Sequence, residues 1–145
     1  MDYRAASAKY YDYQDFPIDD IDFYIAQIPS PQANLLELGC GTGRVLIPLS
    51  QHCRYIHGVD LSPSMLQICC ENMAKANLSP EEARVEQGDI SDLDLGRKFD
   101  LVIAPFRVFQ LLTENEQIES FFDTLRRHLT PGGVAILNTF KGLRL

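Results

Sequence analysis

The sequence predicts an α/β fold in which a doubly wound parallel sheet lies between two layers of helices. Five short segments rich in apolar residues alternate along the chain with segments whose apolar residues repeat at helical spacing. The central short segments are almost continuously apolar, which is typical of strands buried on both faces of a parallel sheet. Three glycines within 39–43 follow the first of these segments. Alternation of this kind favours right-handed crossovers between parallel strands.

The predicted strands are short. They are expected at 34–38, 55–60, 84–87, 99–104 and 134–140. The sequence "TPGG" at 130–133 is rich in turn-forming residues and is expected to lead the chain into the last strand.

Helices are expected between these strands. Ser62 directly precedes Pro63, a combination typical of a helix start, and Asn77 can end the same helix. We interpret its apolar positions, including two adjacent cysteines, as core residues: Leu66, Cys69, Cys70 and Met73. Pro48 is expected to kink the helix that follows the glycines.

Two further helices are predicted near the ends of the chain. Thr113 and Glu116 form a capping-box pattern before an apolar face made of Ile118, Phe121, Phe122, Leu125 and Leu129. Residues 1–30 are rich in aromatic side chains, and Asp19 is expected to cap a short helix within them. The sequence "PSP" at 29–31 marks a boundary, so we divide the chain into segments 1–30 and 31–145.

Length and composition indicate one globular domain. A chain of 145 residues can bury a sizeable core, and 46% of its residues are hydrophobic. The net charge of −7 disfavours a surface built for nucleic acid or for an anionic membrane. No apolar run approaches the roughly 20 residues of a membrane span. The four cysteines have neither metal-site nor redox spacing and fit a reducing cytoplasm, so no metal is expected: Cys40, Cys53, Cys69 and Cys70.

The glycine cluster indicates a nucleoside-containing cofactor. In parallel sheets of this kind, ligands bind beyond the carboxyl ends of the strands, where Gly39, Gly41 and Gly43 are expected. Asp60 ends the next strand, where a carboxylate can accept hydrogen bonds from two ribose hydroxyls. A position at a strand end also suggests that its replacement would leave the fold intact. The phosphate-binding P-loop pattern is absent. The dinucleotide fingerprint GxGxxG is not matched either, because the spacing here is GxGxG and Arg44 stands where the third glycine of the fingerprint would be.

Five motifs in order make the chain resemble the class I S-adenosylmethionine-dependent methyltransferases over residues 33–140. They are "LELGCGTG", "GVDLSPSML", "GDISDL", "FDLVIAPF" and "LTPGGVAIL". The resemblance implies a Rossmann-like sheet with strand order 3-2-1-4-5 and S-adenosyl-L-methionine as the cofactor. It also implies that 1–30 is a helical lid segment and that 31–145 is the cofactor-binding core.

The resemblance further implies a cofactor site without any assigned catalytic residue. The loop Gly39–Gly43 would lie against the amino-acid arm of the cofactor, with Glu37 as its polar support, and Asp60 would hold the ribose. Adenine would be bound by Leu61, Met65, Asp89 and Ile90, and the methionine moiety would be flanked by Ala104 and Phe106. The complete set of expected cofactor-binding residues is Glu37, Gly39, Cys40, Gly41, Gly43, Asp60, Leu61, Met65, Asp89, Ile90, Ala104, Phe106 and Tyr11.

For several other residues the sequence allows both a functional and a purely structural interpretation. Tyr10 and Tyr11 either close over the cofactor or pack in the core. Arg44 either reaches the cofactor carboxylate or is a solvated residue at a helix start. Substrate could approach near Arg107 and Phe109, although phenylalanine at such a position is more often a core residue. The histidines lack partners at useful spacing and are interpreted as structural: His52, His57 and His128.

The acceptor is predicted to be a small molecule, by elimination. Enzymes that methylate exocyclic base amines usually carry [N/D]PP[Y/F] after the fourth strand, whereas this chain has "APFR" there. No cysteine nucleophile of the cytosine-C5 type stands there either. Two alternatives stay open: a cofactor-binding fragment without turnover, and a nicotinamide-dependent oxidoreductase.

The position of the last strand raises a further expectation. Members of this family usually continue with a sixth and a seventh strand, whereas this sequence stops soon after "VAILNTF". We therefore expect a truncated form whose fifth strand is an apolar, unprotected edge that a second copy of the chain could cover.

Overall fold

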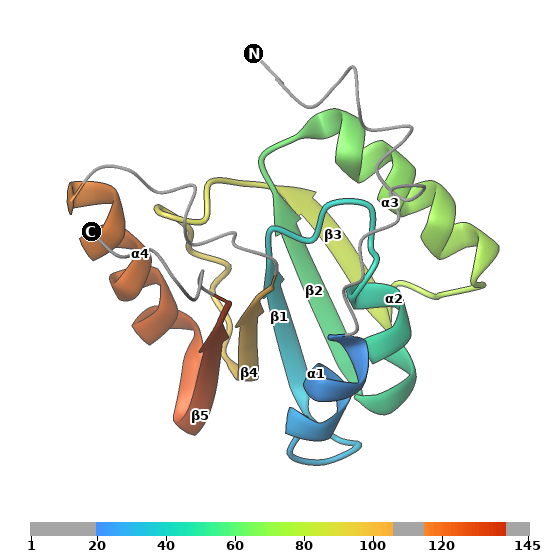
Figure 1. Ribbon diagram of the computed structural model, residues 1–145, viewed down its shortest axis with the longest axis horizontal. Coiled ribbons are helices and arrows are strands. Elements are labelled where there is room, and N and C mark those ends of the chain that lie inside the picture. Colours follow the sequence, from blue (N-terminus) through green and yellow to red (C-terminus); the bar gives the residue numbers. More distant parts are fainter. Residues whose placement is uncertain (1–19, 106–114, 139–145) are drawn as a thin grey trace.

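The computed structural model describes residues 20–105 and 115–138, and the strands in these residues form one five-stranded sheet (Figure 1). The strand order is β3-β2-β1-β4-β5, and every neighbouring pair is parallel. The predicted fold class and strand order are therefore confirmed. The strands are β1 Asn34–Leu38, β2 Tyr55–Asp60, β3 Ala83–Gln87, β4 Phe99–Ala104 and β5 Leu129–Leu137.

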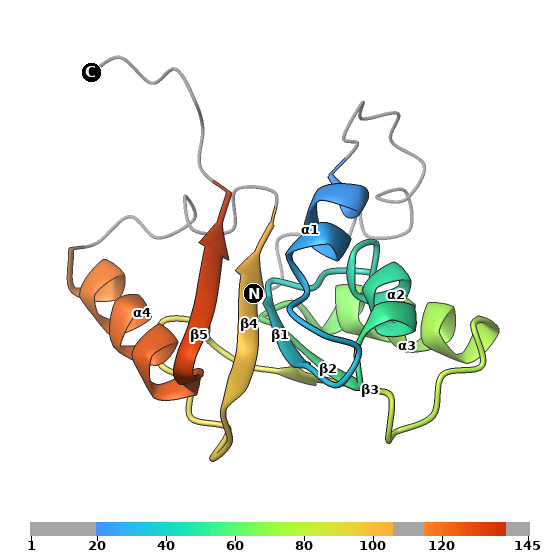
Figure 2. The same cartoon turned by 90° about the horizontal axis from the view of Figure 1, so that it is seen from below.

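Helices pack on both faces of the sheet (Figure 2). They are α1 Ile21–Gln27, α2 Leu46–Leu49 with the following 3₁₀ turn η2 Ser50–His52, α3 Pro63–Lys75 and α4 Asn115–His128. None of the helices described is long and apolar enough to cross a membrane.

Alternation of side chains along β1 explains the two helical layers. Leu35 faces the core that contains Tyr24 of α1 and Leu46 of α2. Leu36, the next residue, faces the opposite core, which contains Phe121 of α4. Because successive strand residues point to opposite faces, a nearly continuous apolar strand contributes side chains to both cores.

Three of the predicted strands have the expected bounds, and two differ. β3 begins one residue earlier than expected, at Ala83. β5 begins at Leu129 instead of 134, so the predicted turn residues 130–133 lie inside the strand, at an irregularity where the pairing with β4 passes from Leu129 directly to Val134. The register between β4 and β5 shifts between Phe99 and Leu101 of β4, so residues 130–133 of β5 have no pairing partner in the register with β4. A proline is tolerated there because β5 pairs only with β4 among the described strands, so its other edge needs no N–H donor.

The predicted ends of α3 are confirmed. Ser62 Oγ accepts a hydrogen bond from the backbone N–H of Met65 at 3.3 Å, and Pro63 occupies the first turn. Asn77 adopts φ of +57° just beyond the helix, a conformation that asparagine tolerates well. Cys69 is buried but Cys70 is exposed, so the interpretation of both as core residues is wrong for Cys70. A helical step of about 100° separates neighbouring side chains on the helix surface.

The other helix starts differ from expectation. Pro48 does not kink a long helix, because α2 contains four residues and continues as the 3₁₀ turn η2. α1 begins after Asp20, whose side chain makes no capping hydrogen bond. The proposed caps Asp19 and Thr113 lie outside the described residues.

Candidate functional site

The glycine loop lies where β1 ends, beside the end of β2 (Figure 1). Gly39, Gly41 and Gly43 all adopt positive φ angles, of 80°, 55° and 90°. A side chain in this backbone conformation is strained. A Cβ on Gly43 would also lie 3.0 Å from both Cys69 Sγ and Ile47 Cδ1. The loop therefore needs glycine for its backbone path and for its close packing on α2 and α3.

Backbone and side-chain hydrogen bonds tie this loop to its neighbours. The N–H groups of Gly39 and Cys40 both donate to the carbonyl oxygen of Val59, at 2.7 and 3.0 Å. On the other side, Asn72 Nδ2 donates to the carbonyl oxygen of Thr42 at 3.0 Å. Sequence reasoning missed Asn72, whose only signal was its place on the same helix as Met65 and Cys69.

Asp60 connects the loop to the start of α3. Its Oδ2 accepts the N–H of Gly41 at 2.8 Å, and its Oδ1 accepts the N–H of Ser62 at 2.9 Å. The side chain is 2% exposed. Gly41 and Asp60, which are 19 positions apart in the sequence, are thus in direct contact, and the carboxylate holds the backbone of the loop and of the start of α3.

Glu37 is a buried carboxyl two residues before the loop. It is 2% exposed, and its Oε1 atom has no hydrogen-bond partner among the residues that the structure describes. Burial is the main cause that raises its pKa well above the usual range, and the nearby groups Cys69, Asp60 and Asp20 add to this effect. Arg44 acts in the opposite direction. A buried carboxyl with an unused acceptor is a costly feature that a ligand could compensate.

Arg44, directly after the loop, forms an ion pair with Asp20. Its Nη1 and Nη2 atoms donate to the two carboxylate oxygens at 2.8 and 3.0 Å, and both side chains are partly buried. This two-bond geometry is the strong form of an arginine–carboxylate contact. The reading of Arg44 as a solvated residue is therefore wrong, and the pair connects the start of α1 to the loop.

Tyr24 of α1 is a further residue that sequence reasoning did not assign to the site. It is buried, and burial together with the nearby carboxyls of Asp20 and Glu37 raises its pKa to about 12. A hydrogen bond from Asn138, just after β5, has a weak opposite effect. Tyr24 therefore stays protonated and brings a hydroxyl group near Glu37.

The expected adenine-binding residues lie in different environments. Leu61 is 63% exposed beside the loop, whereas Met65 is buried and its Cε atom packs below Gly41. Asp89 is exposed and accepts hydrogen bonds from the N–H and the hydroxyl of Ser91, at 2.9 and 2.6 Å. Ile90 is half-buried against the core on the α4 side.

The remaining expected site residues are only partly described. Ala104 is buried at the end of β4, where its carbonyl oxygen accepts the N–H of Asn138. Tyr11 and Phe106 lie outside the described residues, as do Tyr10, Arg107 and Phe109.

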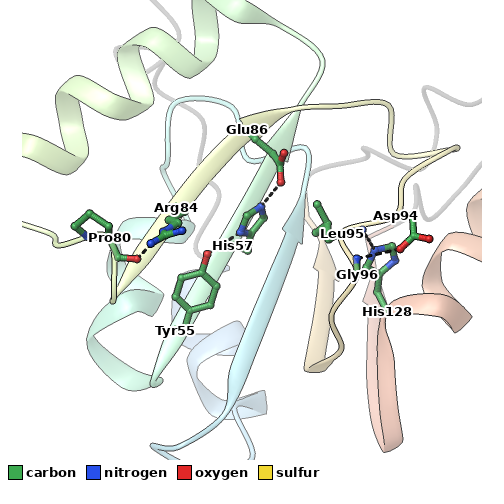
Figure 3. Close-up of polar contacts among 9 residues, drawn as sticks. All are labelled: Tyr55, His57, Pro80, Arg84, Glu86, Asp94, Leu95, Gly96 and His128. Carbon is green, nitrogen blue, oxygen red and sulfur yellow. Dashed lines mark hydrogen bonds and ion pairs between the residues drawn. The ribbon is translucent and has the colours of Figure 1, made fainter.

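Two histidines, His57 and His128, make polar contacts with neighbouring residues (Figure 3). His57 Nε2 is 2.7 Å from Glu86 Oε1, and its Nδ1 is 2.7 Å from the hydroxyl of Tyr55. With Nε2 donating to the carboxylate, Nδ1 accepts from the tyrosine. His128 Nε2 accepts the N–H of Leu95 at 3.0 Å. Both rings use their nitrogens in structural contacts, in agreement with the sequence interpretation.

Comparison with known proteins identifies the family. Residues 35–133 match the family model described as a methyltransferase domain. An N,N-dimethyltransferase for dTDP-3-amino-3,4,6-trideoxy-alpha-D-glucopyranose from Streptomyces venezuelae is 32% identical over 109 residues, which cover 74% of this chain and 43% of that protein.

Solved structures agree with this match. An S-adenosylmethionine-dependent methyltransferase from Clostridium acetobutylicum superimposes with a TM-score of 0.77 at 27% identity, covering 92% of this chain and 55% of that one. An amino pentose methyltransferase from Micromonospora echinaspora gives a TM-score of 0.77 at 26% identity, with coverages of 97% and 58%. The chain thus spans less than half of the Streptomyces relative and little more than half of these structures. With its matched motifs, its strand order and its glycine loop, the chain belongs to the methyltransferase-domain family.

Proposed function

We propose that the protein binds S-adenosyl-L-methionine and transfers its methyl group to a small molecule. The observation that carries this proposal is the contact between the glycine loop and Asp60 at the ends of β1 and β2. The Micromonospora structure is described as bound to S-adenosylmethionine, and a related glycopeptide N-methyltransferase as complexed with sinefungin. Family membership also favours methyl transfer over the nicotinamide-dependent alternative.

The residues of this chain fit such a cofactor. Positive φ angles let the loop Gly39–Gly43 approach a ligand without side chains in the way. Exposed Leu61 offers an apolar surface for a flat base. We assign the ribose hydroxyls to the carboxylate of Asp60, at the end of β2. We assign the adenine edge to Asp89 and Ile90, and the amino-acid arm to the side of Glu37.

The chemistry requires mainly binding and alignment from the protein. The cofactor supplies a methyl group that its positively charged sulfur already activates. Residues of this chain would hold the acceptor in line with that methyl group and exclude water, which is worth roughly 7–11 kcal/mol at most in well-oriented reactions. The residues in 1–30 would supply part of this enclosure as a lid, and no catalytic base is assigned.

We infer that the acceptor atom is an amine nitrogen of a small metabolite, such as an amino sugar. Support comes from the relatives, among which are N,N-dimethyltransferases of amino sugars from Streptomyces venezuelae and Saccharopolyspora spinosa. Because the chain matches only part of these proteins, a cofactor-binding fragment without turnover stays the second candidate.

We further propose that the protein resides in a reducing cytoplasm and that two copies of the chain associate through the edge of β5. All four cysteines are free thiols, which fits a reducing compartment. In the described part of the sheet, β5 has a partner on one side only, and Val134 on it is 54% exposed. Sedimentation at micromolar concentration tests self-association, and a monomer at every concentration would contradict it.

Calorimetric titration tests the proposed cofactor. S-adenosylhomocysteine should bind, and NAD should not. Binding of NAD alone would refute the proposal. Methyl transfer to a panel of small amines, with alcohols and thiols as controls, then tests the acceptor class. Methylation of the alcohols alone would refute the amine assignment.

A further inference from the structure

Glu37 lies near acidic groups from three neighbouring elements, α1, β2 and α3. Asp20 and Tyr24 approach from the α1 side, Asp60 from the end of β2 and Cys69 from α3. Cys40, within the loop, also lies near Glu37. All of these groups can lose a proton, so none of them compensates a negative charge on Glu37.

Among the described residues, Arg44 is the cation that acts on Glu37, and a carboxylate already holds it. Arg44 favours the ionised form of Glu37 but makes two hydrogen bonds to Asp20. Glu37 itself is 2% exposed, and within the described parts of the chain its Oε1 atom has no hydrogen-bond partner. An ionised carboxylate in such a place carries a large desolvation cost, whereas the neutral acid carries much less.

A cationic ligand group would reverse this preference. Opposite charge within about 4–6 Å favours the ionised carboxylate. The amino-acid arm of S-adenosylmethionine carries an ammonium group, and the arm is assigned to the end of the loop next to Glu37. We propose that Glu37 holds a proton in the ligand-free protein and releases it to solvent when this ammonium group binds beside it. This inference rests on the proposed function.

The step is a simple proton transfer. The O–H bond of the Glu37 carboxyl breaks, the electron pair stays on oxygen, and the proton passes to water or buffer. Nothing is oxidised or reduced. Linkage then requires the affinity for the cofactor to rise with pH, by up to tenfold per pH unit if one whole proton is released.

Calorimetry can count the released protons. S-adenosylhomocysteine is titrated in two buffers with different ionisation enthalpies, between about pH 5.5 and about pH 7.5, which lies above the ordinary range of glutamic acid and below that of an α-amino group. We expect net proton release and an affinity that increases with pH. A second probe, 5′-methylthioadenosine, keeps the nucleoside and the sulfur but lacks the amino-acid arm. It should bind without proton release.

Matched variants assign the proton to its residue. Glu37→Gln should abolish proton release and make the affinity for S-adenosylhomocysteine independent of pH in this range. Glu71→Gln, an exposed carboxyl on α3, should keep both effects. If Glu37→Gln does not fold, the comparison of the two ligands with the parent protein still decides the question.

The outcomes separate the inference from the function on which it rests. Binding of S-adenosylhomocysteine without proton release, or the same release in Glu37→Gln, overturns the role of Glu37 and leaves the cofactor assignment intact. Absence of any binding of S-adenosylhomocysteine overturns both.

Discussion

Replacement of Asp60 by alanine should destabilise the ligand-free protein as well as remove cofactor binding. The carboxylate accepts two backbone N–H groups, from Gly41 and Ser62, at 2.8 and 2.9 Å. Hydrogen bonds to a charged group contribute about 1.5–3 kcal/mol each. Because both bonds share one carboxylate and the loop can relax, we expect the lower end of their sum, a loss of about 3 kcal/mol in the free energy of unfolding. The sequence suggested only that such a variant stays folded; the two hydrogen bonds add the expectation that it folds with lower stability.

Asp89→Ala is the matched control for this experiment. Asp89 also accepts two hydrogen bonds, but both come from Ser91, two residues away, and its side chain is exposed. Its loss should therefore cost about 1 kcal/mol or less. Urea denaturation followed by circular dichroism measures both variants. If Asp60→Ala and Asp89→Ala lower the free energy of unfolding equally, the carboxylate of Asp60 does not organise the loop.

Two further substitutions test the packing and the titration of the sheet. Gly58→Ala on β2 would place a Cβ 2.6 Å from Leu46 Cδ1 and 2.9 Å from the Cβ of Cys40. Overpacking should therefore lower the free energy of unfolding by about 1–3 kcal/mol, and displacement of the loop should weaken binding of S-adenosylhomocysteine. An unchanged melting temperature and an unchanged affinity would contradict this close contact. Burial lowers the pKa of His57, although its hydrogen bond to Glu86 acts in the opposite direction. The neutral ring is therefore favoured in the fold, and its contribution to stability is present above about pH 6.5 and is lost as the pH falls through the lower folded pKa. Melting temperatures of the parent and of His57→Gln should converge on acidification, and parallel curves would show that His57 does not contribute.

Local sequence was sufficient for the parts of the fold that depend on near neighbours. The bounds of β1, β2 and β4 follow from short apolar runs that are bounded by polar or turn residues. Ser62 and Asn77 delimit α3 because capping is a contact within a few residues. The glycines of the loop are likewise explained by their own backbone angles.

The tertiary structure alone decided the contacts between segments that are distant in sequence. Arg44 pairs with Asp20 across 24 positions, which no local pattern indicates. The start of β5 depends on its register with β4 and on its place at the edge of the described sheet. Glu37 was visible as part of a motif, but its unpaired oxygen and its acidic surroundings arise only when α1, β2 and α3 pack around β1. The physical reason is the same in each case: burial and charge depend on the groups that folding brings together, and not on the order in which the chain presents them.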